Sequence, residues 1–279
     1  MTALNAFAGE MRDAAATGRW ASECLKLEAA TYPKPGLVSH VDAGAHQDMD
    51  AALLNASADA LEAYFADLAE AGAAGAPMGR LRVIGMAAER AMLTRTGGVN
   101  THRGAIFGLG LLCAAAGFRR AYRASGALGA IVAARWGGEI LHGPVALRSH
   151  GAEVARRHGA GGARAQAAAG FPALYDVALP ALSLGRRLAP GDAEAARVQA
   201  CMGLIASVED TNLLYRGGPQ GLAFARLQAR RFLDEGGVGS ADWRGRAATI
   251  HEAFVARRLS PGGCADLLAM ALFADGVGV

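Results

Sequence analysis

The chain has 279 residues, of which 52% are hydrophobic but only 6% aromatic, and its formal net charge at pH 7 is +3. So small a charge, with arginines scattered along the chain, excludes a general nucleic-acid binder. The longest apolar runs are shorter than the roughly 20 residues that a membrane-spanning helix needs, which excludes a membrane protein. Alanine, the strongest helix former, is abundant, and strand-favouring residues are sparse, so we predict an all-α protein with closely packed helices.

The length fits one all-helical domain over residues 1–279, built from roughly nine to ten or more helices. The N-terminal segment carries acidic residues and lacks a basic start followed by an apolar core, so we expect no signal peptide and a cytoplasmic protein. The four cysteines form no CxxC pair, and three of them lie among apolar helical residues and are expected to be small core side chains.

Apolar spacing predicts four helices in the first half of the chain, over residues 11–30, 57–71, 78–93 and 101–117. Pro33 and Pro35 end the first of them, and a polar loop with the sequence YPKPGLVSHVDAGAHQDM follows. Ser57 is the expected N-cap of the second helix. The third helix stops at the Gly97-Gly98 pair.

The second half of the chain is expected to hold helices over residues 125–135, 139–158, 173–188 and 192–208, and then 219–234, 240–257 and 262–273. Pro172 suits a first helical turn, and Asp192 and Ser240 are expected N-caps. Ser260 followed by Pro261 predicts the start of the last helix.

The block TGGVNTHRG, residues 96–104, lies between two apolar helical segments. Its glycine pair allows positive φ and close approach of the backbone to a ligand. Asn100 or Thr101 would cap the next helix, and His102 and Arg103 would project from its first turn. This is how a phosphate-binding helix start is built, although it matches no standard nucleotide loop.

Standard nucleotide and zinc signatures are missing from the chain. Instead, four polar blocks with glycines lie at helix junctions, over residues 34–48, 97–103, 161–166 and 209–218. Loops that carry Lys, His, Asp, Asn and Arg between apolar helices are candidates for one shared pocket. The alternative for each block is that it only caps its own helices.

The acids of these blocks are candidates for Mg²⁺ ligands, because hard divalent cations prefer carboxylates and are shared with substrate phosphates. The set is Asp48, Glu209 and Asp210. Glu209 and Asp210 are expected at a helix C-terminus, where negative charge is unfavourable and calls for a cation or a nearby arginine. His46 and His102 are candidates for a general acid or base; a phosphate contact or simple capping is the alternative for His102.

The basic and amide side chains of the blocks are candidates for substrate binding. Lys34, held between two prolines, would aim its ammonium at a phosphate or remain solvated. Three arginines would make forked contacts to phosphate oxygens or form surface ion pairs, namely Arg103, Arg164 and Arg216. Asn100, Thr101 and Asn212 complete the predicted substrate-binding set.

Five motifs in this order resemble the triphosphoribosyl-dephospho-CoA synthase family. They are YPKPGLVSHVDAGAHQDM, TGGVNTHRGAIFGLGLL, SHGAEV followed by GGARAQAAAGFP, EDTNLLYRGG and LSPGGCADLLA, and the resemblance runs from about Cys24 to Met270. One departure is Gln166, where relatives often carry an acid, so Gln166 receives no catalytic role. GVNTHRGAIF and the compact chain resemble the malonate decarboxylase-associated subgroup more than the citrate lyase subgroup.

The resemblance implies an all-helical fold and an unusual glycosyl transfer. The 2′-hydroxyl of 3′-dephospho-CoA attacks C1′ of the ATP ribose, and adenine leaves. The product would pass to a phosphoribosyl-dephospho-CoA transferase that acts on an acyl-carrier subunit. Asp48 or Asp210 would stabilise the ribose cation or accept the hydroxyl proton, and His46 or His102 would protonate adenine or contact the triphosphate.

Two other functions stay open at this point. One is a different nucleotide-using transferase or hydrolase, which would release adenine from ATP without dephospho-CoA. The other is a non-catalytic nucleotide-binding protein of the decarboxylase assembly, which would bind ATP without turnover. The oligomeric state, monomer or homodimer, is open as well.

Overall fold

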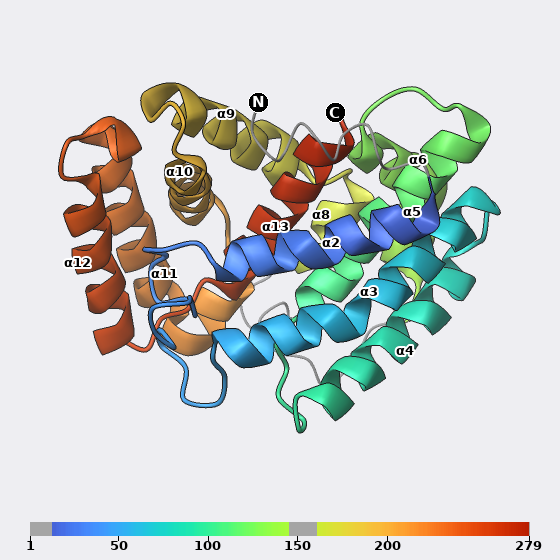
Figure 1. Cartoon of the computed structure of the whole chain (residues 1–279), viewed down its shortest axis with the longest axis horizontal. Helices are drawn as coiled ribbons and strands as arrows, with labels where there is room; N and C mark the ends of the chain where they lie inside the picture. Colours follow the sequence, from blue (N-terminus) through green and yellow to red (C-terminus); the bar gives the residue numbers. More distant parts are fainter. Residues whose placement is uncertain (1–12, 145–160, 279) are drawn as a thin grey trace.

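The computed structural model describes residues 13–144 and 161–278, and within them the fold is entirely helical (Figure 1). The first half contains α2 (Ala14–Ala29), α3 (Ala51–Ala73), α4 (Met78–Arg95), α5 (Arg103–Tyr122) and α6 (Leu128–His142). The second half contains α8 (Gly162–Ala168), the π-helix η1 (Ala173–Ala178), α9 (Leu179–Leu188), α10 (Ala193–Ser207), α11 (Thr211–Asp234), the 3₁₀ turn η2 (Gly237–Gly239), α12 (Trp243–Ala256) and α13 (Gly262–Val277). The predicted all-α class is confirmed.

Helix α5 forms the centre of the molecule and packs against α3, α6 and α13. Glycines make the contact with α3 unusually close. A Cβ on Gly72 of α3 would lie 1.9 Å from the carbonyl oxygen of Ala114, and a Cβ on Gly117 of α5 would lie 1.9 Å from that of Ala69. The small residues therefore bring helix backbones together, as the composition predicts.

Several predicted helix ends are wrong. Helix α3 begins six residues earlier than expected, because Asp50 is its N-cap and accepts a hydrogen bond from the Leu53 N–H at 2.8 Å. Ser57, the predicted cap, is buried inside the helix. The predicted break between the helices over 125–135 and 139–158 is wrong, since α6 continues through Gly137 and Gly138 to His142. The expected continuation over 145–158 lies outside the described residues.

In the second half of the chain, one predicted cap is confirmed and other predicted helix starts are wrong. Asp192 caps α10 as predicted, with its carboxylate 2.9 Å from the Ala195 N–H. Helix α11 already begins at Thr211 and is kinked at Gly218, whose φ of 60° and ψ of −165° are not helical. Asp242 rather than Ser240 precedes α12, and Pro261 rather than Ser260 precedes α13.

The loop over residues 30–50 lies against the C-terminal helices and is held there by His251 of α12. Nδ1 of His251 is 2.7 Å from the Lys34 carbonyl oxygen, and Nε2 of His251 is 3.1 Å from the carboxylate of Asp42. Gly36 lies so close to the backbone of Leu259 that a Cβ would be 1.9 Å from its carbonyl oxygen. The polar loop is thus fixed on the same side as the start of α13.

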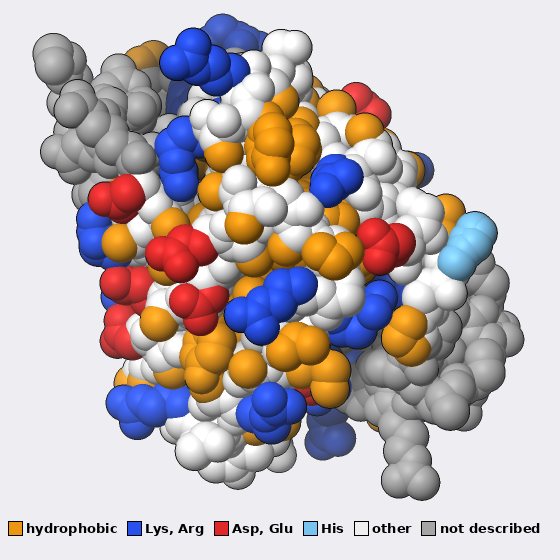
Figure 2. Space-filling model, turned by 90° about the vertical axis from the view of Figure 1, so that its right-hand side faces the viewer, with side chains coloured by type: hydrophobic (Ala, Val, Ile, Leu, Met, Phe, Trp, Pro, Cys, Tyr) orange, Lys and Arg blue, Asp and Glu red, His pale blue; other side chains and the backbone are white. Residues whose placement is uncertain are grey.

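Within the described residues, α5 is long and apolar enough by itself to cross a membrane. Helix α8 and the helical segment Ala173–Leu188 are long and apolar enough only when taken together, and they are bent by 86° relative to each other. Because 67% of the apolar window in α5 is buried by neighbouring helices, its composition is that of a core helix. All four cysteines are buried and free, one more than the three predicted as core side chains. On the face shown in Figure 2, basic, acidic and apolar side chains are interspersed.

Candidate functional site

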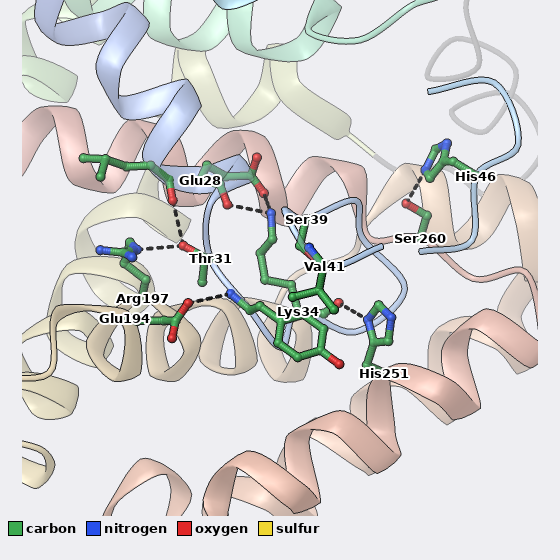
Figure 3. A network of polar contacts seen from close by, with 12 residues as sticks. Glu28, Thr31, Lys34, Ser39, Val41, His46, Glu194, Arg197, His251 and Ser260 are labelled. Carbon is green, nitrogen blue, oxygen red and sulfur yellow. Dashed lines mark hydrogen bonds and ion pairs between the residues drawn. The ribbon is translucent and has the colours of Figure 1, made fainter. Parts of the chain in front are cut away.

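A buried ion pair lies where α2 ends and the polar loop begins. The Lys34 ammonium donates a hydrogen bond to the Glu28 carbonyl oxygen at 2.6 Å and also binds the Glu28 carboxylate (Figure 3). Both side chains are buried, with exposed fractions of 0% for Lys34 and 8% for Glu28. The predicted phosphate contact of Lys34 stays a prediction, because in this structure its charge is balanced by Glu28.

The start of α5 carries a short chain of hydrogen-bonding side chains. Nδ1 of His102, the N-cap residue, lies 2.9 Å from the Ser57 hydroxyl, which lies 2.7 Å from the Thr101 hydroxyl. The Asn100 side-chain oxygen accepts a hydrogen bond from the Arg103 N–H at 3.2 Å, so Asn100 satisfies one free donor of the helix. Burial, with the Lys34 ammonium nearby, lowers the pKa of His102 to about 4, so its imidazole is neutral at pH 7.

Asp210 joins the start of α11 to the start of α13. One carboxylate oxygen accepts hydrogen bonds from the N–H groups of Asn212 and Leu213, at 2.8 and 3.0 Å, and the other accepts one from the Cys264 N–H at 2.8 Å. The carboxylate therefore lies at a helix N-terminus, where negative charge is favourable. The expected electrostatic penalty at this position is wrong. Burial nevertheless raises the pKa of Asp210.

Asp266, in the second turn of α13, faces the start of α5. A Cβ on Gly104 would lie 2.0 Å from the Asp266 carboxylate, so this glycine makes room for the acid. The carboxylate accepts a hydrogen bond from the Ala105 N–H, while burial and the charges of Glu28 and Asp210 raise its pKa well above the usual value. Two of the sequence motifs thus meet at one carboxyl group.

A second polar group surrounds His46, on the loop beside α11 and α13. Nε2 of His46 lies 2.9 Å from the Ser260 hydroxyl (Figure 3). Nδ1 of His46 lies 3.4 Å from the Asp48 carboxylate, and the Arg216 guanidinium lies 3.4 Å from the ring. Burial and Arg216 lower the pKa of His46, and Asp48 partly offsets them. An open depression of about 600 Å³ adjoins this group and is lined by Asp48, Met49 and the first turns of α3.

The structure places the other predicted residues elsewhere. Arg103 pairs with Glu89 at 2.5 Å. Arg164 donates hydrogen bonds to four carbonyl oxygens at the end of α6, including that of Gly143 at 3.0 Å, and so closes that helix. Exposed Glu209 lines a separate depression of about 320 Å³. The binding roles predicted for both arginines stay predictions.

The predicted metal ligands do not lie together. Asp48 is 62% exposed beside His46, Glu209 faces solvent, and both oxygens of Asp210 accept backbone hydrogen bonds. Across residues 13–144 and 161–278, three or more acidic, histidine or cysteine side chains nowhere form a group that could hold a metal ion. Gln166 accepts a hydrogen bond from the Ala173 N–H, and the SHGAEV motif lies outside the described residues.

Sequence reasoning missed Glu28 and Asp266, and it assigned Ser57 only a capping role. For Asp266, the available signal was an acid on an otherwise apolar helix. Between Gly262 and Val277, the only charged residues are Asp266 and Asp275. Such an acid is seldom enclosed unless it has a partner or a function.

The starts of α5 and α13 therefore combine the neutral imidazole of His102 with the carboxyl group of Asp266, whose pKa is raised. Groups whose environments shift their pKa values in opposite directions are suited to accept and donate protons in one reaction. The N–H groups at these helix starts add partial positive charge, which favours anionic ligands. The arrangement suits proton transfer beside an anionic substrate.

Comparison with known proteins supports one family over nearly the whole chain. Residues 14–279 match the model of the CitG family, described as ATP:dephospho-CoA triphosphoribosyl transferase. A protein of Pectobacterium carotovorum subsp. carotovorum, named probable 2-(5''-triphosphoribosyl)-3'-dephosphocoenzyme-A synthase, is 40% identical over 265 residues, which cover 89% of this chain and 85% of the relative. Proteins of the same name from Stutzerimonas stutzeri and Pseudomonas putida are both 41% identical, and the matches cover 91% and 92% of this chain and 89% and 93% of the relatives. No solved structure matches.

Proposed function

Because the chain belongs to the CitG family of ATP:dephospho-CoA triphosphoribosyl transferases, we propose that it supplies the prosthetic-group precursor of malonate decarboxylase. Its activity is that of a triphosphoribosyl-dephospho-CoA synthase. The malonate role is supported by the GVNTHRGAIF block and the compact chain, which resemble that subgroup; the citrate lyase role is the alternative.

The observation that carries the proposed reaction at this site is the meeting of distant motifs at the start of α13. Asp266 lies over Gly104 of α5, and the carboxylate of Asp210 holds the Cys264 N–H. His102 caps the same end of α5 that receives Asp266. One compact site therefore contains an anion-favouring helix start, a proton acceptor and a carboxyl group.

The reaction forms a bond between the 2′-oxygen of dephospho-CoA and C1′ of the ATP ribose, and it breaks the bond from C1′ to adenine. The hydroxyl loses a proton, adenine gains one, and positive charge develops on the ribose ring in the transition state. Neutral His102 is the proposed acceptor of the hydroxyl proton. We assign Arg216 and His46 to phosphate oxygens of a substrate, because His46 lines the open depression beside α3 and the Arg216 guanidinium lies 3.4 Å from its ring.

Magnesium is proposed as a companion of the nucleotide rather than as an ion held by the protein alone. The predicted ligands Asp48, Glu209 and Asp210 do not fit a shared ion, since they lie apart and Asp210 is already occupied by backbone N–H groups. Mg²⁺ commonly enters such sites on substrate phosphates.

The direct test incubates the purified protein with ATP, Mg²⁺ and 3′-dephospho-CoA and identifies the products by mass. Triphosphoribosyl-dephospho-CoA and free adenine in equal amounts are expected. Adenine without the condensed product would indicate a hydrolase, and bound ATP without turnover would indicate a non-catalytic nucleotide-binding protein. Either result would refute the transferase proposal.

A companion experiment compares Asp48→Asn and Asp210→Asn, the two carboxylates predicted from the sequence. If either carboxylate stabilises the ribose cation, its loss costs on the order of 10²-fold in adenine release. Near-wild-type rates in both folded variants would refute both assignments. Asp210→Asn is expected to lower stability as well, because it weakens the cap of α11.

The malonate role is tested by deleting the gene and measuring the masses of the acyl-carrier subunits of the cell by mass spectrometry. We expect the carrier of malonate decarboxylase to lack its prosthetic group and growth on malonate to fail; loss on the citrate lyase carrier alone would overturn the malonate role. A phosphoribosyl-dephospho-CoA transferase is the proposed recipient of the product. The cytoplasm is the proposed compartment, in keeping with four free thiols.

A further inference from the structure

Asp266 occupies a position that only a glycine on the facing helix makes available. Its carboxylate lies 2.0 Å from where a Cβ of Gly104 would be, and it accepts a hydrogen bond from the Ala105 N–H. The contact places the acid beside the first turn of α5, whose N-cap is His102. The residue as a whole is half-buried, and its carboxyl group is packed onto Gly104 and the Ala105 N–H.

The charged and titratable groups around Asp266 come from several elements. Glu28 of α2 and Asp210 before α11 place negative charge nearby, and α5 contributes the Ala105 N–H. Cys264, on the same helix as Asp266, is a buried thiol whose own pKa is raised. The Lys34 ammonium binds Glu28, and no ion pair to Asp266 is present in the part of the chain that the structure describes. Burial and the two carboxylates both raise the pKa of Asp266, which favours its protonated form.

We propose that Asp266 is the general acid that transfers its proton to the departing adenine. This inference rests on the proposed transferase function and adds a catalytic residue to it. As the bond from C1′ to adenine breaks, its electron pair goes to the base, and a ring nitrogen of adenine receives the Asp266 proton. The 2′-oxygen of dephospho-CoA bonds to C1′ and gives its proton to His102. Proton return from His102 to Asp266, directly or through water, restores both groups.

The other candidate acids are less suited to this role. His102 has a pKa of about 4, so at pH 7 it is a neutral imidazole and not the imidazolium that would act as a general acid. Both oxygens of Asp210 are engaged by backbone N–H groups, whereas Asp48 is 62% exposed. The pKa of His46 is lowered as well, mainly by burial. Asp266 alone in this set combines a pKa well above its usual value with a carboxyl group packed against the first turn of α5.

The test measures adenine release by Asp266→Asn with two nucleotides, ATP and the triphosphate of 6-chloropurine riboside. The chlorinated base leaves more readily without a proton. With ATP we expect kcat to fall on the order of 10²- to 10⁴-fold, and with the analogue by at least about tenfold less. The affinity for ATP should stay near that of the wild type. Asp275→Asn is the matched control, because Asp275 lies on the same helix in an ion pair with Arg186 and should leave kcat unchanged.

The pH profile gives a second readout. Wild-type kcat should decline at high pH, where Asp266 loses its proton, and the variant should lack this decline. Gly104→Ala is a second variant that displaces the carboxylate without removing it, and it should reproduce the same dependence on the leaving base. An equal loss with both nucleotides, or a kcat within about threefold of wild type, would overturn the assignment. A wild-type protein that makes no condensed product would instead refute the transferase proposal itself, and this inference with it.

Discussion

Acidification should destabilise the protein through His102, and a single substitution should remove part of that effect. The imidazole is buried with 5% exposure, and Lys34 lies near enough to oppose a second positive charge. In the unfolded chain the same side chain takes up a proton near its ordinary pKa of 6.5, whereas the folded protein resists protonation until about pH 4. Protons therefore favour the unfolded state over this window.

The magnitude follows from linkage between protonation and folding. The separation between 6.5 and about 4 corresponds to about 3 kcal/mol of unfolding free energy. The loss begins as the pH falls below 6.5, reaches about 2 kcal/mol near pH 5, and is complete below about pH 4. Above pH 6.5 the group is neutral in both states and contributes no pH dependence.

The assay is urea unfolding followed by circular dichroism at about pH 7.5 and pH 5 for the wild type and His102→Asn. The variant carries an amide that does not titrate, so its loss on acidification should be about 2 kcal/mol smaller. His142→Asn, at the exposed end of α6, serves as the control and should change nothing. Identical pH dependence in His102→Asn and the wild type would refute the account of a buried neutral imidazole.

Two further predictions concern stability. Glu28→Ala leaves the Lys34 ammonium buried without its carboxylate and should lower the unfolding free energy by about 3–5 kcal/mol in urea titrations. The control is Lys26→Ala, which removes a solvent-exposed ion pair and should cost less than about 1 kcal/mol. Equal costs would contradict the buried-pair reading. In thermal denaturation, Gly85→Ala should raise Tm, with a gain of up to about 1 kcal/mol, because its new Cβ meets open space on α4. Gly72→Ala should lower Tm, because its Cβ would lie 1.9 Å from a carbonyl oxygen of α5. A gain in both would mean that the close helix packing is not rigid.

The all-α fold was predictable because helix formation depends on local spacing and composition. Apolar residues recur every three to four positions, and each helix carries that pattern regardless of its neighbours. Asp192 was identified as a cap for the same reason, since an N-cap bonds N–H groups only two or three residues away. Gly97 and Gly98 also adopt the positive φ values expected of them, 64° and 94°.

Motif content showed that polar blocks gather at helix junctions, but it could not assign partners to single side chains. Ser57 resembled a helix cap and is instead a buried partner of His102, 45 residues away. Arg164 resembled a phosphate ligand, yet it binds carbonyl oxygens at the end of α6. In both cases the side chain fits two environments, and the packing of other helices selects one.

The sequence by itself determined the helical class, the family and the loops in which the polar residues lie. Tertiary structure decided which charges are enclosed and which face one another. The ion pair between Glu28 and Lys34 and the contact of Asp266 with Gly104 depend on how α2, α5 and α13 cross. Burial and charge over such distances fix the protonation of His102 and Asp266, and local sequence patterns carry no record of either.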